Sequence, residues 1–107
     1  MNPDLIVTVS IACSSLTEAQ TLARLLVEQR LAACVQMSQI RSVFRWEGQI
    51  EEADEVLLTA KTLHDRLPAI EALVMEHHVY QVPEILATAV DWASEPYARW
   101  LHDALNG

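Results

Sequence analysis

The sequence predicts an α+β fold in which the elements follow the order β-α-β-β-α-β, with one further helix at the C-terminus. Three observations predict it: an alternating apolar strand near the N-terminus, two apolar stripes of helical period, and one long extended stretch between them. This order is that of the ferredoxin-like arrangement, a four-stranded antiparallel sheet with helices on one face. The 107 residues, 51% of them hydrophobic, are expected to form a single domain spanning 1–107.

The first strand is predicted over residues 5–13, where apolar residues occupy every second position. Its odd-numbered face is wholly apolar and consists of Leu5, Val7, Val9, Ile11 and Cys13. Its other face is small and uncharged and consists of Ile6, Thr8, Ser10 and Ala12. We therefore expect a central strand whose second face is covered too.

The first helix begins with a capping box, in which Ser15 is the N-cap and Glu18 stands three residues later. Apolar residues then recur at helical spacing through Val27. The helix is expected to end near Arg30.

A long β-hairpin is predicted from Leu31 to Thr62, with its turn at Glu47-Gly48. Gly48 is the only internal glycine, and glycine is the residue that adopts a positive φ at the lowest cost. Each arm has about twelve residues, which span roughly 40 Å at ~3.3 Å per residue. Arms of this length exceed what a small sheet needs, so we expect something outside the local fold to cover the far end.

The outgoing arm of this hairpin changes its apolar phase. Val35 and Met37 are odd-numbered, whereas Ile40, Phe44 and Trp46 are even-numbered. Such a change requires either a β-bulge or a change of packing partner. One hypothesis is that the near half packs on its own subunit and the far half on a neighbouring one; the other is a single bulge in a monomer.

The second helix is predicted with Asp65 as its N-cap and with Pro68 in its first turn, where proline is tolerated. Its apolar stripe consists of Ile70, Leu73, Val74 and His77. It is expected to end near His78, where a cationic imidazole favours the helix dipole. The position of His77 on the stripe favours a core histidine over a ligand.

The last two elements are a short strand and a helix. Proline at position 83 suits the start of an edge strand, which is predicted from Ile85 to Val90. Ser94 caps the final helix, and Asn106-Gly107 closes it. Its stripe consists of Tyr97, Trp100, Leu101, Ala104 and Leu105.

Charge and cysteine usage exclude several classes of protein. Seven Lys and Arg against fifteen Asp and Glu give a net charge of −8, which disfavours nucleic acid and membrane surfaces as partners. Cys13 and Cys34 lack CxxC spacing and are expected to be free thiols in a reducing compartment. The N-terminus has no basic region of a signal peptide, so a cytoplasmic location is expected.

No nucleophile elbow, phosphate-binding loop, HExxH or CxxC motif occurs in the sequence, and this favours a binding protein over an enzyme. Lys61, at an apolar strand end, is either an edge residue with its ammonium in solvent or an anion partner in a cleft. Trp46, Trp92 and Trp100 are expected as core or subunit-interface anchors.

Besides an anion-binding cleft at Lys61, the sequence offers a metal-binding site as a candidate functional site. Copper and similar ions prefer imidazole and thiolate, and the chain has four histidines and two cysteines. In the predicted fold the end of the first strand and the end of the second helix lie on one side of the sheet, so Cys13 and His78 are candidate ligands. His77 joins them only if the helix frays before it, because adjacent helical residues point about 100° apart. Weak, pH-dependent binding of copper is expected.

Five short motifs follow one another along the chain: Leu31-Ala32-Ala33-Cys34-Val35, Trp46-Glu47-Gly48, Glu55 with Lys61-Thr62, His78-x-Tyr80-x-x-Pro83-Glu84, and Tyr97-x-x-Trp100. In this order and spacing they resemble the CutA-type divalent-cation tolerance proteins over nearly the whole chain.

The resemblance implies a ferredoxin-like subunit in a tight homotrimer whose hairpins pair with neighbours. It also implies a role in tolerance of divalent metals such as copper, with no enzymatic reaction. The trimer of this family is similar to that of the PII signalling proteins, which bind small molecules between subunits. A PII-like sensor is therefore the alternative, with Lys61, His78, Tyr80 and Trp46 as the residues expected at the inter-subunit cleft.

The chain departs from the family pattern at a few positions. Val79 replaces the proline of the family's His-Pro-Tyr, and Ala89 and Ala93 replace a usual proline and a usual glycine. The cysteine that the family associates with metal aligns with Ile11, and Cys13 stands two residues further on.

Overall fold

In the computed structural model, which describes residues 4–107, the elements follow the predicted order, with a short 3-10 helix before the second α-helix. The elements are β1 (Ile6–Cys13), α1 (Leu16–Glu28), β2 (Cys34–Trp46), β3 (Gln49–Leu63), η1 (His64–Arg66), α2 (Leu67–His77), β4 (Ile85–Ala89) and α3 (Glu95–Asn106).

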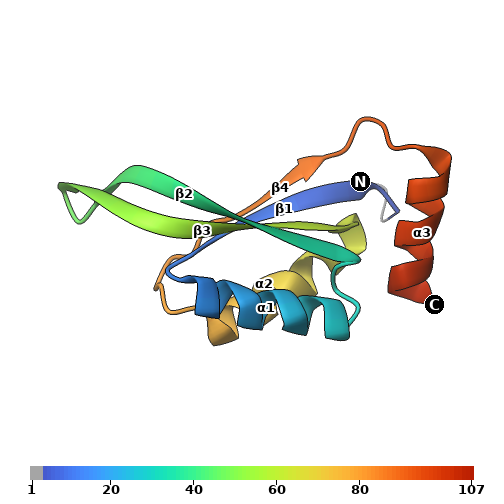
Figure 1. Cartoon of the computed structure of the whole chain (residues 1–107), viewed down its shortest axis with the longest axis horizontal. Coiled ribbons are helices and arrows are strands. Elements are labelled where there is room, and N and C mark those ends of the chain that lie inside the picture. Colours follow the sequence, from blue (N-terminus) through green and yellow to red (C-terminus); the bar gives the residue numbers. More distant parts are fainter. Residues whose placement is uncertain (1–3) are drawn as a thin grey trace.

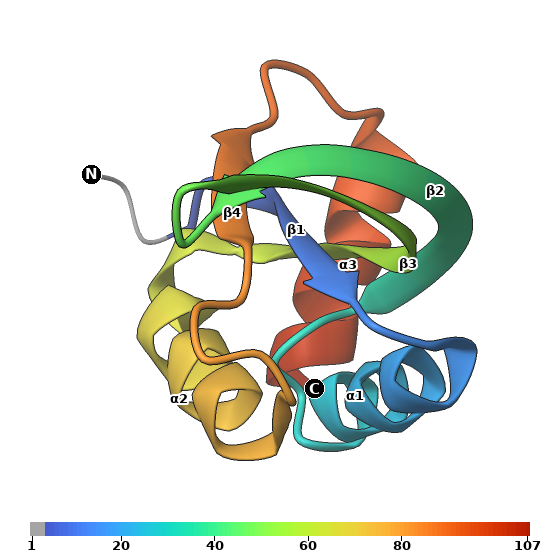
Figure 2. The ribbon, with the colours of Figure 1, turned by 90° about the vertical axis from the view of Figure 1, so that its left-hand side faces the viewer.

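The four strands form one antiparallel sheet in the order β2-β3-β1-β4. α1 and α2 lie side by side on one face of this sheet, and α3 lies at the end opposite the hairpin tip (Figures 1 and 2). β1 is central and β4 is an edge strand, as predicted. The α+β fold with a ferredoxin-like order and a C-terminal helix is thereby confirmed.

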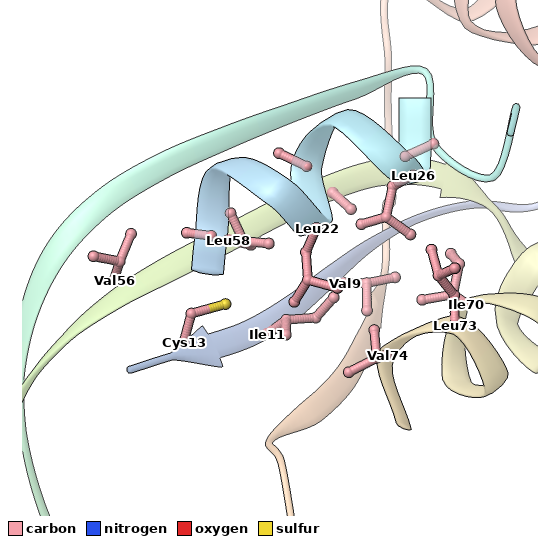
Figure 3. Packing of buried hydrophobic residues seen from close by; sticks show 14 of the residues in the cluster. Val9, Ile11, Cys13, Leu22, Leu26, Val56, Leu58, Ile70, Leu73 and Val74 are labelled. Atoms are coloured by element: carbon pink, nitrogen blue, oxygen red, sulfur yellow. The ribbon is translucent and has the colours of Figure 1, made fainter. Parts of the chain in front are cut away.

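The main core lies between the sheet and the two helices, as Figure 3 shows. The odd-numbered face of β1 is fully buried there, and its partners are Leu22 and Leu26 of α1 and Ile70 and Val74 of α2. A second, smaller cluster joins Leu63 to Leu101 and Leu105 of α3, with Ile6 packed against it. α3 therefore covers only one end of the open sheet face, and Thr8 and Ser10 stay half-buried.

The β2–β3 hairpin turns through Glu47 and Gly48, whose φ angles are 50° and 78°. Two consecutive positive φ angles between the paired residues Trp46 and Gln49 define a two-residue type I′ turn. The predicted reversal is confirmed, and the arms of 13 and 15 residues are slightly longer than expected. Figure 1 shows that the hairpin tip extends well beyond the end of β1.

The pairing of β2 with β3 contains no bulge, so the monomeric-bulge hypothesis is wrong. The register runs without interruption from Cys34 opposite Lys61 to Trp46 opposite Gln49. Val35 therefore packs against the core, while Phe44 and Trp46 lie on the opposite face of the same ribbon, 42% and 40% exposed. Within one chain, the change of phase leaves large apolar side chains uncovered.

The start of α2 and the position of His77 differ from the prediction. Asp65 does not cap the helix; it lies in η1 and its carboxylate accepts a hydrogen bond from Arg66 at 2.6 Å. The extra 3-10 turn moves the N-cap of the α-helix one residue along, from Asp65 to Arg66. His77 is the last residue of α2 and is exposed, so it is not a core histidine, because the buried stripe ends at Val74.

Glu47 holds a conformation that costs an L-amino acid about 1 kcal/mol and that asparagine adopts more readily. We expect Glu47→Asn to raise the free energy of unfolding by about 0.5 kcal/mol, measured by denaturant titration at fixed protein concentration. Gly48→Ala, at a φ of 78°, is expected to lower it by about 1 kcal/mol. A destabilising Glu47→Asn together with a stabilising Gly48→Ala would contradict the type I′ assignment.

Candidate functional site

Three chemically different side chains meet where β1 ends, α1 begins and α2 ends. A ligand atom of each of Cys13, Glu18 and His78 lies within 4.8 Å of those of the other two. We call these residues the Cys13–Glu18–His78 cluster. Cys13 is fully buried, and the side chains of Glu18 and His78 are 8% and 0% exposed.

The end of α2 determines which of the two adjacent histidines reaches the cluster. His77 still has helical geometry and points to solvent. His78 is the C-cap and has extended backbone angles, with φ −82° and ψ 142°. Its side chain therefore leaves the helical path and lies in the interior against the end of β1.

Hydrogen bonds fix the His78 ring. Nε2 lies 2.7 Å from the carbonyl oxygen of Ala12, and Nδ1 accepts the backbone N–H of Tyr80 at 3.0 Å. Since a carbonyl only accepts, the proton is on Nε2 and the lone pair is on Nδ1, on the side of Glu18. Metal-binding histidines are commonly oriented in this way, by donation from the other ring nitrogen to a backbone carbonyl.

Glu18 does more than complete the capping box that the sequence predicts. The predicted N-cap is confirmed, since the Ser15 hydroxyl accepts the Glu18 N–H at 3.2 Å. The Glu18 carboxylate, however, accepts the N–H of Ser14 at 2.8 Å and the N–H of Val79 at 2.9 Å. It therefore joins the start of α1 to the loop after α2 and lies 3.8 Å from His78 Nδ1.

The carboxyl groups of Glu18 and Glu55 lie close to the thiol of Cys13. Burial, with the Glu18 and Glu55 carboxylates, raises the pKa of Cys13 to about 12. Burial, with the 2.8 Å hydrogen bond that its hydroxyl donates to Glu55, raises the pKa of Tyr80 to about 12. Both groups are therefore neutral at pH 7, next to two largely buried carboxyl groups.

The donor set fits a borderline divalent ion. It offers one sulfur, one imidazole nitrogen and one carboxylate oxygen, the combination that copper and zinc accept. Two donors of a tetrahedral ion are about 3.5 Å apart, so the three ligand atoms, which lie up to 4.8 Å from one another, have to approach by about 1 Å to bind one ion. Binding would displace the thiol proton of Cys13 and the Tyr80 N–H from His78 Nδ1.

The other predicted site residues lie elsewhere. His77 is exposed and is not part of the cluster. Tyr80 and Trp46 line a hollow of about 890 Å³ beneath the outer part of the hairpin. Lys61 lines a separate hollow of about 260 Å³ beside α3. One chain alone therefore does not bring the predicted cleft residues together.

The family model of the CutA1 divalent ion tolerance proteins matches residues 7–104. The chain belongs to this family. The mouse protein CutA is 41% identical over 93 residues, which cover 86% of this chain and 52% of that protein. A divalent-cation tolerance protein CutA from Thermus thermophilus is 40% identical over 86 residues, 79% of this chain and 84% of that protein. The chain spans about half the length of the mouse relative.

Solved CutA structures have the same fold. The Archaeoglobus fulgidus protein superimposes with a TM-score of 0.93 at 31% identity, covering 95% of this chain and 100% of that one. CutA1 from Shewanella sp. SIB1 gives a TM-score of 0.92 at 33% identity over all of both chains. The A. fulgidus protein is described as periplasmic, so the cytoplasmic location of this chain stays a prediction. No helix within residues 4–107 is long and apolar enough to span a membrane.

Proposed function

We propose that this member of the CutA1 family is a non-enzymatic metal-tolerance protein that binds copper-type divalent ions at the Cys13–Glu18–His78 cluster. The observation that carries the proposal is the convergence of sulfur, oxygen and nitrogen donors within 4.8 Å of one another in a nearly solvent-free place. The names of the relatives, which refer to divalent-cation tolerance, support the metal but not its identity. Copper is proposed because its preference for sulfur and nitrogen donors matches Cys13 and His78.

Each residue of the cluster has a distinct part in this proposal. Cys13 supplies a thiolate after losing its proton, His78 supplies the Nδ1 lone pair, and Glu18 supplies negative charge and one oxygen. The neighbouring carboxylate of Glu55 adds charge that favours a bound cation. A raised thiol pKa is opposite to what a nucleophilic cysteine requires, which supports a role without covalent catalysis.

Calorimetric titration with copper tests this proposal. We expect one ion per chain in the wild type and at least tenfold weaker binding in Cys13→Ser, Glu18→Gln and His78→Ala. His77→Ala is the matched control, since it removes an exposed imidazole one residue away and should leave the affinity unchanged. Equal affinity in all four variants would remove the cluster from the site.

The proposal also predicts that the apparent affinity for copper depends on pH. Because the pKa of Cys13 is about 12, the thiol is protonated at pH 7 and 9, and binding releases one proton in this range. The apparent affinity should therefore rise about tenfold per pH unit. In Cys13→Ser this slope should disappear. A pH-independent affinity in the wild type would contradict thiolate ligation.

We also propose that the chain assembles as a homotrimer through the open sheet face and the hairpin tip. The second face of β1 carries no charge, and α3 covers only one end of it. Exposed apolar side chains also cluster at the hairpin and at the β4 edge: Val43, Phe44, Trp46, Ile50, Val82 and Leu86. Burying such patches is typical of obligate assemblies, whose interfaces exceed about 2,000 Å².

A small-molecule sensor of the PII type is the second candidate. The hollow of about 890 Å³ beside Tyr80 and Trp46 favours it, since drug-sized ligands occupy cavities of roughly this size. A thermal-shift screen of nucleotides and metabolites in metal-free buffer separates the two candidates. A ligand that raises the melting temperature without metal favours the sensor, and a rise only with copper favours the metal protein.

A further inference from the structure

The loop between α2 and β4, residues 79–84, is bound to the Cys13–Glu18–His78 cluster through its own backbone. The N–H of Val79 donates to Glu18 Oε2 at 2.9 Å, and the N–H of Tyr80 donates to His78 Nδ1 at 3.0 Å. These two acceptors lie 3.8 Å apart and belong to two of the three side chains that could hold an ion. Two consecutive N–H groups of the loop therefore bind the atoms that a metal ion would also bind.

The two acceptors differ in how much they leave for an ion. His78 Nδ1 has one lone pair, because the proton of the ring is on Nε2, where it is donated to a backbone carbonyl at 2.7 Å. The Tyr80 N–H uses this lone pair, so its hydrogen bond and an ion at Nδ1 exclude each other. Glu18 Oε1 accepts the N–H and the hydroxyl of Ser14, at 2.8 and 3.2 Å, so Oε2 is the oxygen on which loop and ion meet.

Tyr80 also holds the loop through its side chain. Its hydroxyl donates to Glu55 on β3 at 2.8 Å, and its ring centre lies 4.8 Å from that of His78. All of these contacts join parts of one chain, and their partners Glu18, Glu55 and His78 are largely buried. The arrangement therefore does not depend on which surfaces of the chain a neighbouring subunit covers.

We propose that the 79–84 loop is a metal-responsive switch: an ion that binds His78 Nδ1 displaces the Tyr80 N–H, and the loop leaves the cluster. The switch depends on the metal site proposed above and adds what binding does to the protein. Because ion and loop compete for the same lone pair, each lowers the affinity of the site for the other. A loop that changes its conformation when the ion binds gives the protein a means of reporting the ion as well as holding it.

Hydrogen exchange followed by mass spectrometry tests the release of the loop, on the full chain in its native assembly with and without copper. A ligand that only adds contacts to the folded state slows exchange, because it stabilises that state. We expect the opposite for the segment that contains the amides of Val79 and Tyr80, where exchange should become at least tenfold faster. Exchange in α3, at the other end of the molecule (Figure 1), should not become faster.

Val79→Pro tests the same competition through the affinity for copper. Proline has no N–H, so the substitution removes one of the two bonds that hold the loop and changes no proposed ligand. His78 has a ψ of 142°, the extended conformation that a residue before proline prefers. We expect Val79→Pro to bind copper at least threefold more tightly than the wild type. Val79→Ala is the matched control, because it keeps the N–H, and its affinity should equal that of the wild type.

Calorimetry on the same samples separates the switch from the metal site. No copper binding by the wild type would contradict the metal site, and the switch with it. Copper that binds at the cluster while exchange in the 79–84 loop stays the same or slows would overturn the switch and leave the metal site in place. Equal affinity of Val79→Pro and Val79→Ala would likewise show that loop and ion do not compete. If Val79→Pro does not fold, the exchange measurement on the wild type still decides.

Discussion

Glu18→Ala is expected to lower the free energy of unfolding by about 2 kcal/mol, because it leaves two backbone donors without their acceptor. Those donors are the N–H groups of Ser14 and Val79, which lie on segments far apart in the sequence. Their loss would loosen both the start of α1 and the loop that positions His78. Denaturant titration at one fixed protein concentration measures the change.

Glu28→Ala is the control for this prediction. Glu28 is an exposed carboxylate at the other end of α1, and its one ion pair, with Arg24, is solvent-exposed. Its removal should change the free energy of unfolding by less than about 0.5 kcal/mol. The free energy of unfolding of Glu18→Gln should lie between those of Glu18→Ala and Glu28→Ala, since an amide oxygen can still accept one of the N–H groups. A Glu18→Ala variant as stable as Glu28→Ala would show that the carboxylate does not hold these segments together.

Trp46→Ala is expected to weaken the proposed trimer by about 3 kcal/mol, because large aromatic side chains dominate the energy of protein interfaces. Trp46 lies next to the hairpin turn, on the face of β2 opposite the side chains that pack on the core, and is 40% exposed in one chain. Light scattering over a dilution series should show dissociation of the variant at concentrations where the wild type keeps the mass of a trimer.

Met75→Ala provides the comparison, since Met75 is 52% exposed on α2, which covers the sheet face opposite the proposed interface (Figure 1). Its removal should leave the mass unchanged. A wild type that is a stable monomer of 12.0 kDa at micromolar concentration would end the trimer proposal. If the wild type is a trimer and Trp46→Ala dissociates no more readily, Trp46 is not an anchor of the interface.

The fold could be predicted from the sequence because its signals are local. Alternation defines β1, the pair Ser15 and Glu18 defines the start of α1, and Gly48 defines the turn of the hairpin. The start of α2 was mistaken because a 3-10 turn and an α-helix share their first residues, so Asp65 satisfies the capping pattern without being the cap.

The candidate site was predicted only in part, because its geometry depends on contacts across the chain. The sequence offered Cys13, His78 and His77 as candidate ligands, and the structure brings the first two together. The exclusion of His77 depends on the residue at which α2 ends, a boundary that periodicity does not resolve. Glu18 was missed as a site residue because its contact with Val79 spans 61 positions. The carboxylate of Glu55 was missed because only the folded chain places it beside Tyr80.

The most direct test of the central claim is the X-ray absorption spectrum of the copper-loaded wild type and of Cys13→Ser. Ligation by the Cys13–Glu18–His78 cluster predicts one sulfur neighbour at about 2.3 Å, together with nitrogen and oxygen at about 2.0 Å. In Cys13→Ser the sulfur neighbour should be absent. A wild-type spectrum that contains only nitrogen and oxygen neighbours would contradict the claim, because it would exclude Cys13 from the metal.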